Sequence, residues 1–340
     1  MLTPTPSEIL RTLSRVQEPD LHQDLVSLNM IEEVEVDVLT ETIRFLIRLT
    51  TPSCPLKDRM EADCRQVLRE DWGESWKVEI RMEARTLGRI QGMDWLLGVH
   101  NLVMVASGKG GVGKTTVAVN LAKALRDAGA KVGLLDADLY GPNVPLMLGV
   151  EGRQPGLKDN RMIPVEVDGL QMMSVALLIE ASRPLIWRGP MASNTLKQFF
   201  SEVDWGELDY LVLDLPPGTG DVQLTLTKLF PEAFGLLVTT PQAMALADAL
   251  KAGRMFQTEG TRLNLLGMVE NMAWFSPAEQ PDMRYYPFGK GGTEALAQQL
   301  SLDILTTLPL TDGPSETSRE AYALLAGEVS RRIAVHHRTQ

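Results

Sequence analysis

The segment Gly108-Lys109-Gly110-Gly111-Val112-Gly113-Lys114-Thr115 limits the fold of this chain more than any other feature. It follows the pattern G-x-x-x-x-G-K-T, directly after the apolar stretch LVMVAS (102–107) and shortly before the helical pattern VAVNLAKALRDAGA (117–130). A glycine-rich loop of this spacing between a strand and a helix is a P-loop, in which backbone N–H groups surround phosphate oxygens at a helix N-terminus. The pattern therefore predicts a nucleotide phosphate site within a parallel α/β sheet.

The residues of this loop have separate expected roles. Lys114 is expected to reach the β- and γ-phosphates, and the Thr115 hydroxyl is an expected ligand of Mg²⁺. A glycine-rich turn that binds no nucleotide is the alternative, but the flanking strand and helix argue against it. The full set of expected nucleotide contacts in the loop is Gly108, Lys109, Gly110, Gly111, Val112, Gly113, Lys114, Thr115 and Thr116.

Acidic residues end two of the predicted strands. Asp214 ends YLVLD, a pattern typical of the carboxylate that holds Mg²⁺ through water, and Asp136 and Asp138 end VGLLDAD. Side chains at the carboxyl ends of parallel strands point into the crevice where ligands bind. Helix capping is the alternative role for all three. The segment 218–221 (GTGD) is expected to change conformation with the γ-phosphate, as switch segments do.

The second part of the chain predicts a sheet covered on both faces. Near-continuous apolar strands alternate with helical patterns, which is typical of parallel sheets in α/β proteins. The expected strands are 102–107, 131–138, 208–216, 233–240 and 264–272, and the expected helices are 117–130, 191–202, 221–230, 243–258 and 320–335. Within a helix-poor region, MIPVEVDGLQMMSV predicts a hairpin around Asp168-Gly169.

The first part of the chain predicts a small α+β domain. Apolar residues alternate with charged ones in VEVDV (34–38), IRFLIRL (43–49) and WKVEIRM (76–82), and helices are expected over 7–17 and 55–70. The expected organisation is a domain over 1–85, a linker over 86–100 and a P-loop domain over 101–340. Two domains fit a chain of 340 residues.

Composition narrows the classes of function. Acidic residues outnumber basic ones 44 to 33, and no block carries the basic excess typical of a nucleic-acid-binding surface. No apolar run approaches the roughly 20 residues that a membrane helix needs, and no signal peptide is visible. Two cysteines cannot form a disulfide framework, and four scattered histidines show no zinc spacing. We expect a cytoplasmic protein that binds neither nucleic acid nor membrane.

Lys109 is an additional lysine inside the P-loop. With it, KGGVGKT resembles the deviant Walker A signature of a family that includes the partition ATPases and the nitrogenase iron protein. The resemblance implies a homodimer in which Lys109 reaches the partner subunit's nucleotide. The alternative is a lysine that is merely exposed to solvent.

Longer segments indicate the branch of that family. GKGGVGKTTVAVNLAKAL, LLDADLYGPNVPLMLG, DYLVLDLPPGTGDVQLTL and VENMAWF resemble the Mrp/ApbC-type ATPases that carry iron–sulfur clusters, over nearly all of residues 100–300. VQEPDLHQDLVSLNMI and LTTPSCPLKDRMEADC resemble the small SufT/PaaD-like domain often fused to them. This resemblance implies that Asn271 contacts the adenine base, although Asn271 could instead cap the strand end. It also implies ATP, Mg²⁺ and an iron–sulfur cluster as cofactors.

One departure from that family concerns the cluster ligands. Most members carry a C-x-x-C pair after the ENM strand, but residues 65–340 of this chain contain no cysteine, which resembles a subgroup found in cyanobacteria and plastids. The best candidate ligand is Cys54, because Pro55 is expected at the first position of a helix, and a helix N-terminus favours the thiolate. Cys64, ten residues later, is expected to be a buried helix cysteine.

These observations favour one function and leave two alternatives. The favoured function is a homodimeric ATPase that binds an iron–sulfur cluster and transfers it to apo-proteins, with assembly scaffold proteins as further partners. Lys109, Lys114 and Asp138 are its expected catalytic residues, with Asp138 as the general base or water-positioning group. The alternatives are a partition- or positioning-type ATPase and an ATP-switched scaffold without its own cluster.

Overall fold

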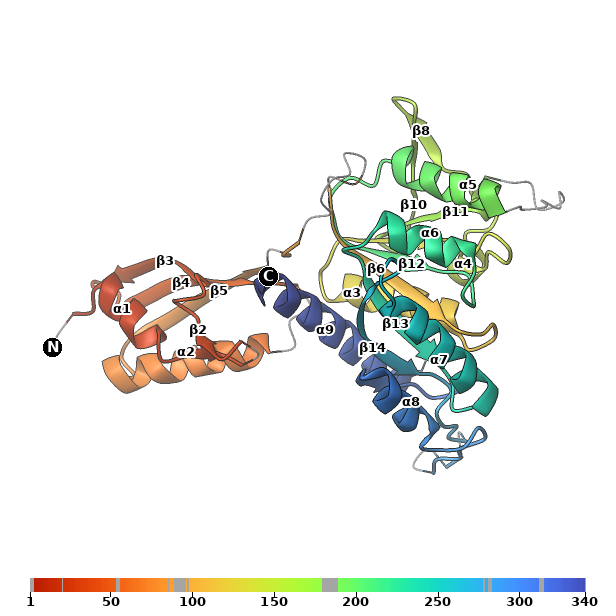
Figure 1. Cartoon of the computed structure of the whole chain (residues 1–340). Coiled ribbons are helices and arrows are strands. Elements are labelled where there is room, and N and C mark those ends of the chain that lie inside the picture. Colours follow the sequence, from red (N-terminus) through yellow and green to blue (C-terminus); the bar gives the residue numbers. More distant parts are fainter. Residues whose placement is uncertain are drawn as a thin grey trace. The chain divides into compact units, whose positions relative to one another are not determined.

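The structure is a computed structural model. It describes residues 3–19, 21–52, 56–84, 86–88, 96, 98–178, 189–277, 279–280, 283–311 and 315–339. Contacts divide the chain into two compact units, Met1–Leu87 together with Ser330–Gln340, and Gly88–Val329. Both the N-terminal residues (red in Figure 1) and the last residues of the chain (blue) therefore belong to the smaller unit.

The smaller unit contains a three-stranded sheet with helices on one face. The sheet has the order β3 (Ile31–Asp37), β4 (Thr42–Leu49), β5 (Lys77–Ala84), with β3 antiparallel and β5 parallel to β4. Helices α1 (Pro6–Leu13) and α2 (Lys57–Trp72) share a core with the sheet, whose buried members include Ile9, Leu13, Ile43, Phe45, Ile47, Met60, Cys64 and Leu68. The alternation in IRFLIRL explains why one face of β4 is apolar. The short strands β1 (Gln17–Glu18) and β2 (Gln23–Asp24) pair with each other and precede β3 in the chain.

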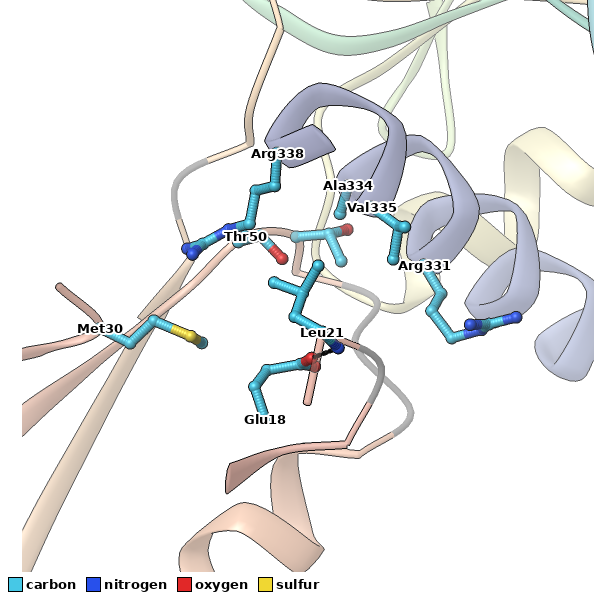
Figure 2. A pocket seen from close by; sticks show the side chains of 9 residues that line it. Glu18, Leu21, Met30, Thr50, Arg331, Ala334, Val335 and Arg338 are labelled. Carbon is cyan, nitrogen blue, oxygen red and sulfur yellow. Dashed lines mark hydrogen bonds between the residues drawn. The ribbon is translucent and has the colours of Figure 1, made fainter. Parts of the chain in front are cut away.

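The last turns of α9 (Glu316–Thr339) complete this unit. Arg338 Nη1 donates a hydrogen bond to the Leu28 carbonyl oxygen over 3.4 Å. Figure 2 shows the small pocket enclosed there, lined by Glu18, Leu21, Met30, Thr50, Thr51, Arg331, Ala334, Val335 and Arg338. Its volume of about 20 Å³ holds about one water molecule, so it is a packing gap rather than a ligand site.

The larger unit is built on an eight-stranded sheet. Its order is β10 (Val165–Val167), β11 (Leu170–Ser174), β7 (Val132–Asp136), β12 (Leu208–Asp214), β6 (Val99–Ser107), β13 (Phe234–Thr239), β14 (Asn264–Glu270), β15 (Ile304–Thr307). All neighbouring strands are parallel except β10 and β11, which form the hairpin expected from the sequence. Asp168 and Gly169 both have positive φ, at 49° and 76°, as a two-residue type I′ turn requires.

Helices cover both faces of this sheet. On one face, Leu102, Met104 and Ala106 of β6 join a core with residues of α5 (Gly189–Ser201), α6 (Asp221–Leu229), α7 (Ala243–Gln257) and α8 (Gly292–Leu300). The alternate residues Val103 and Val105 are equally buried and point the other way. Helix α3 (Lys114–Asp127) contacts β6, β7 and β12 without belonging to that core, and so covers the opposite face. The predicted α/β class, with a preceding small α+β domain, is confirmed.

Several short elements were not expected from the sequence. The helix-poor region contains α4 (Val144–Leu148) and a small hairpin of β8 (Gly156–Lys158) and β9 (Arg161–Ile163), and α8 and β15 follow later. Strand β6 begins at Val99, three residues before the strand predicted from LVMVAS. None of the described helices combines the length and apolar character needed to cross a membrane.

Candidate functional site

The loop between β6 and α3 is shaped by its glycines. A Cβ at Gly108 would lie 2.2 Å from the Asp248 carbonyl oxygen in α7, so only glycine lets the loop pass this close to that helix. Gly111 and Gly113 have φ of +82° and +80°, in the left-handed region that favours glycine. At Gly111 a Cβ would meet nothing within 4 Å, which shows that this side of the loop is open. Such a loop at the N-terminus of α3 is suited to hold phosphate oxygens.

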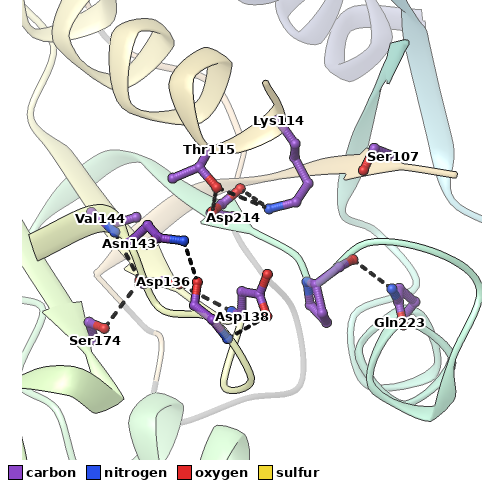
Figure 3. Close-up of polar contacts among 12 residues, drawn as sticks. Ser107, Lys114, Thr115, Asp136, Asp138, Asn143, Val144, Ser174, Asp214 and Gln223 are labelled. Carbon is purple, nitrogen blue, oxygen red and sulfur yellow. Dashed lines mark hydrogen bonds and ion pairs between the residues drawn. The ribbon is translucent and has the colours of Figure 1, made fainter. Parts of the chain in front are cut away.

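Lys114, Thr115 and Asp214 meet at the carboxyl end of β12 (Figure 3). Lys114 Nζ forms an ion pair with Asp214 Oδ1, and the Thr115 hydroxyl donates to Asp214 Oδ2 over 2.6 Å. Lys114 is 6% exposed and Asp214 is fully buried. Burial raises the pKa of the Asp214 carboxyl, and the Lys114 ammonium opposes this rise. A threonine hydroxyl next to a carboxylate provides the hard oxygen ligands that Mg²⁺ prefers, so these residues fit that ion.

Asp136, the last residue of β7, is a second buried carboxylate of the site. It pairs in register with Asp214 on β12, and its side chain is fully buried. Its oxygens accept hydrogen bonds of 3.2 Å from the Asp138 and Val144 backbone N–H groups and from the Ser174 hydroxyl. Burial and, secondly, the Asp214 charge raise the pKa of Asp136 to about 7. Asp136 thus fastens both ends of the segment 138–144.

Asp138 lies half-buried at the start of that segment. Burial raises the pKa of its carboxyl, whereas the charge of Lys114 lowers it. Asp138 Oδ1 also accepts a hydrogen bond from the Gly141 N–H over 3.3 Å. The structure therefore brings Asp138 near the expected phosphate position, and its role in catalysis stays a prediction.

Lys109 and Asn271 differ in the hydrogen bonds that their side chains make. Lys109 is half-buried, and its ammonium makes no hydrogen bond or ion pair with the residues that the structure describes. Asn271 follows β14, is 6% exposed, and donates from Nδ2 to the Val112 carbonyl oxygen over 2.9 Å. Asn271 thereby ties the P-loop to the end of β14, which lies two strands away from β6 in the sheet. Its contact with adenine stays a prediction, as does the role of Lys109 in a partner subunit.

Three polar residues at the site were not singled out from the sequence. The Ser107 hydroxyl donates to the Lys109 carbonyl oxygen, Ser174 binds Asp136, and Gln223 donates to the segment after Asp214. Ser107 and Ser174 end strands β6 and β11, and Gln223 lies in the first turn of α6. A polar residue closing an apolar strand is the signal that could have identified the two serines.

The structure describes only one of the two cysteines, Cys64. Cys54 lies outside the described residues, together with Ser53 and Pro55. Helix α2 begins at Lys57, two residues later than the start expected at Pro55. Cys64 is fully buried, as expected, and burial raises the pKa of its thiol to about 12, so it stays protonated at neutral pH. The part of the chain that the structure describes contains no group of three or more His, Cys, Asp or Glu residues suited to a metal ion.

Comparison with known proteins adds a family to this geometry. The family model described as NUBPL iron-transfer P-loop NTPase matches residues 98–337. The chain belongs to this family. A second family model, described as iron–sulfur cluster assembly protein, matches residues 6–80 of this P-loop NTPase. Both matches confirm the families expected from the P-loop segments and from the N-terminal segments.

Individual relatives support the assignment over nearly the full length. A protein of Synechocystis sp. named iron–sulfur cluster carrier protein is 40% identical over 352 residues, covering 97% of this chain and 98% of its own. A Deinococcus radiodurans protein of the same name is 45% identical over 303 residues, covering 89% and 84%. Among solved structures, a nucleotide-binding protein of Archaeoglobus fulgidus in complex with ADP has a TM-score of 0.54 and 33% identity, and covers 68% of this chain and 88% of its own.

Proposed function

We propose that this P-loop NTPase is an ATP-dependent iron–sulfur cluster carrier that works as a homodimer in the cytoplasm. Its partners would be apo iron–sulfur proteins and assembly scaffold proteins, and not nucleic acid or membrane. The observation that carries the proposal is the meeting of Lys114, Thr115 and Asp214 at an open glycine loop. It is supported by relatives that are named cluster carriers and by one that is named in complex with ADP.

The nucleotide site would act by exchange of ionic partners. Lys114 pairs with Asp214, and phosphate oxygens of bound ATP would replace the Asp214 carboxylate as partner of the ammonium. Asp214 and Thr115 would then be free to hold Mg²⁺, which when bound neutralises phosphate charge. Asp138 would orient water, and Lys109 would stabilise charge at the partner subunit's nucleotide.

The cluster would be cargo held by the smaller unit. With no cysteine after residue 64, and with Cys64 buried as a neutral thiol, Cys54 is the remaining thiolate candidate. A shared cluster would then use Cys54 from two subunits, with other positions filled by external ligands. Incomplete protein coordination would make the cluster labile, which suits a carrier. The shortage of cysteine also favours a second candidate, an ATP-switched scaffold without its own cluster.

Anaerobic reconstitution with iron and sulfide tests the cluster assignment. We expect the wild type to retain iron and acid-labile sulfide, and Cys54→Ser to lose both. Cys64→Ala is the matched control, because it removes the other thiol from a buried site, and it should retain most of the cluster.

Two results would contradict this assignment in different ways. Stable cluster binding by Cys54→Ser would exclude Cys54 as an essential ligand. A wild type that hydrolyses ATP but retains no cluster would support the scaffold instead.

A further inference from the structure

Gln223 is a buried amide beside the phosphate site, and the proposed function assigns it no role. It is the third residue of α6 and is 1% exposed. Its side chain turns back toward the preceding loop (Figure 3). Nε2 donates to the Pro216 carbonyl oxygen over 2.6 Å and to the Gly218 carbonyl oxygen over 3.2 Å. One amide group therefore holds two carbonyls of the segment that follows Asp214.

The same segment is held from its other side by the strand that leads into the P-loop. The Gly218 N–H donates to the Ser107 carbonyl oxygen over 2.8 Å, and the Leu215 N–H donates to the Val105 carbonyl oxygen over 3.1 Å. The Pro217 ring also lies beside the P-loop, 3.9 Å from where a Cβ of Gly110 would be. Residues 216–218 are thus fixed between α6 and the phosphate loop.

The identity of the side chain matters for this arrangement. Glutamine or glutamate at the third helical position commonly accepts a hydrogen bond from the N-cap N–H. Here the N-cap residue is Gly220, and Gln223 donates to carbonyls instead. Only the amide provides two N–H donors, whereas an ionised glutamate accepts only. Buried carbonyls that lose their donors are costly, so the segment depends on Gln223.

Beyond the residues fixed in this way, the loop is exposed throughout. Within 216–218, Pro216 is buried, Gly218 is half-buried and Pro217 is exposed, whereas Thr219, Gly220 and Asp221 are all exposed. We propose that Gln223 is a positioning residue that fixes 216–218 on the P-loop and leaves 219–221 as the part that responds to the γ-phosphate. Helix α6 is thereby coupled to the phosphate site through its first turn. This inference rests on the proposed ATPase function.

The test compares Gln223→Met with Gln257→Met. Methionine keeps the length of the side chain and removes its donors. Gln257 controls for the lost hydrogen bond: its side chain is exposed, but its Nε2 also donates to a backbone carbonyl, that of Leu300, over 2.6 Å and away from the P-loop. For Gln223→Met we expect a kcat about tenfold lower, with a KM for ATP within about twofold of wild type. Gln257→Met should change neither constant.

Hydrogen exchange of the nucleotide-free protein provides a readout that does not depend on turnover. In Gln223→Met, peptides covering 215–220 should exchange at least tenfold faster, because the Gly218 N–H loses its fixed position. If these peptides exchanged at the wild-type rate in Gln223→Met, the inference would be overturned. This outcome is independent of the proposed function, because it can be observed even if the wild type hydrolyses no ATP. Equal loss of kcat in both variants would also overturn it, because a general loss of stability would then explain the effect.

Discussion

The ion pair between Lys114 and Asp214 allows the site to be tested without nucleotide. Their side chains are 6% and 1% exposed, so both charges are removed from water. Removing one partner of a buried pair leaves an uncompensated charge and costs about 3–5 kcal/mol. Asp214→Asn keeps the size of the side chain and an acceptor for Thr115, and leaves the Lys114 ammonium unpaired. We expect it to lower the free energy of unfolding by about 3 kcal/mol.

The reverse substitution should cost less. In Lys114→Met the remaining carboxyl is that of Asp214, whose pKa burial already raises, so it can take up a proton. We expect a loss of about 1–2 kcal/mol. The double variant combines Lys114→Met with Asp214→Asn and has no charge at either position. It should be more stable than Asp214→Asn alone, because both charges of a buried pair can be replaced together at little cost.

The assay is urea unfolding of the four proteins in nucleotide-free buffer without Mg²⁺. Lys251→Met is the control in the same unit, because Lys251 pairs with Asp248 over 3.0 Å while 74% exposed. Its loss should change the free energy of unfolding by less than about 1 kcal/mol. The reasoning is refuted if Asp214→Asn is no less stable than Lys251→Met. It is refuted equally if the double variant shows the sum of both single losses.

Two further results are expected. The raised pKa of Asp136, about 7 against an ordinary 3.8, means that the folded protein binds this proton more tightly than the unfolded chain. Stability should therefore fall as pH rises from about 4 to about 7, by at most about 4 kcal/mol, and Asp136→Asn should flatten this slope in urea unfolding at several pH values. In steady-state assays, Lys114→Ala should abolish ATP turnover, and Lys109→Ala should lower turnover more than nucleotide affinity; equal turnover by Lys109→Ala and wild type would contradict catalysis in trans.

Local sequence patterns predicted the parts of the fold that are decided locally. The strand, glycine loop and helix around Lys114 follow from motif spacing, and Asp214 follows from the position where an apolar strand ends. The Asp168-Gly169 turn was equally predictable, because its two positive φ angles favour these residue types. In each case the residues that determine the structure are neighbours in sequence.

Other features depend on contacts between distant residues. Asn271 donates to Val112, which is 159 residues away, and Ser174 of β11 donates to Asp136 of the neighbouring strand β7. No periodicity reveals such pairs. The apolar stripe of 320–335 predicted a buried helix. It did not predict that the residues of this helix up to Val329 belong to the larger unit and those from Ser330 to the smaller unit. Helix α4, with five residues, is too short for a helical period to stand out.

The distribution of reactive groups sets a condition on how ATP could act on a cluster. Every nucleotide-site residue described above lies in Gly88–Val329, whereas Cys54 and Cys64 lie in Met1–Leu87. In the proposed carrier, therefore, no side chain of the phosphate site is also a thiolate ligand of the cluster. ATP hydrolysis would then not act directly on the residues that hold the cluster. The nucleotide would have to act through conformation or through assembly of two subunits. The exposed tip 219–221, next to the segment that Gln223 fixes, is where the first of these routes would begin.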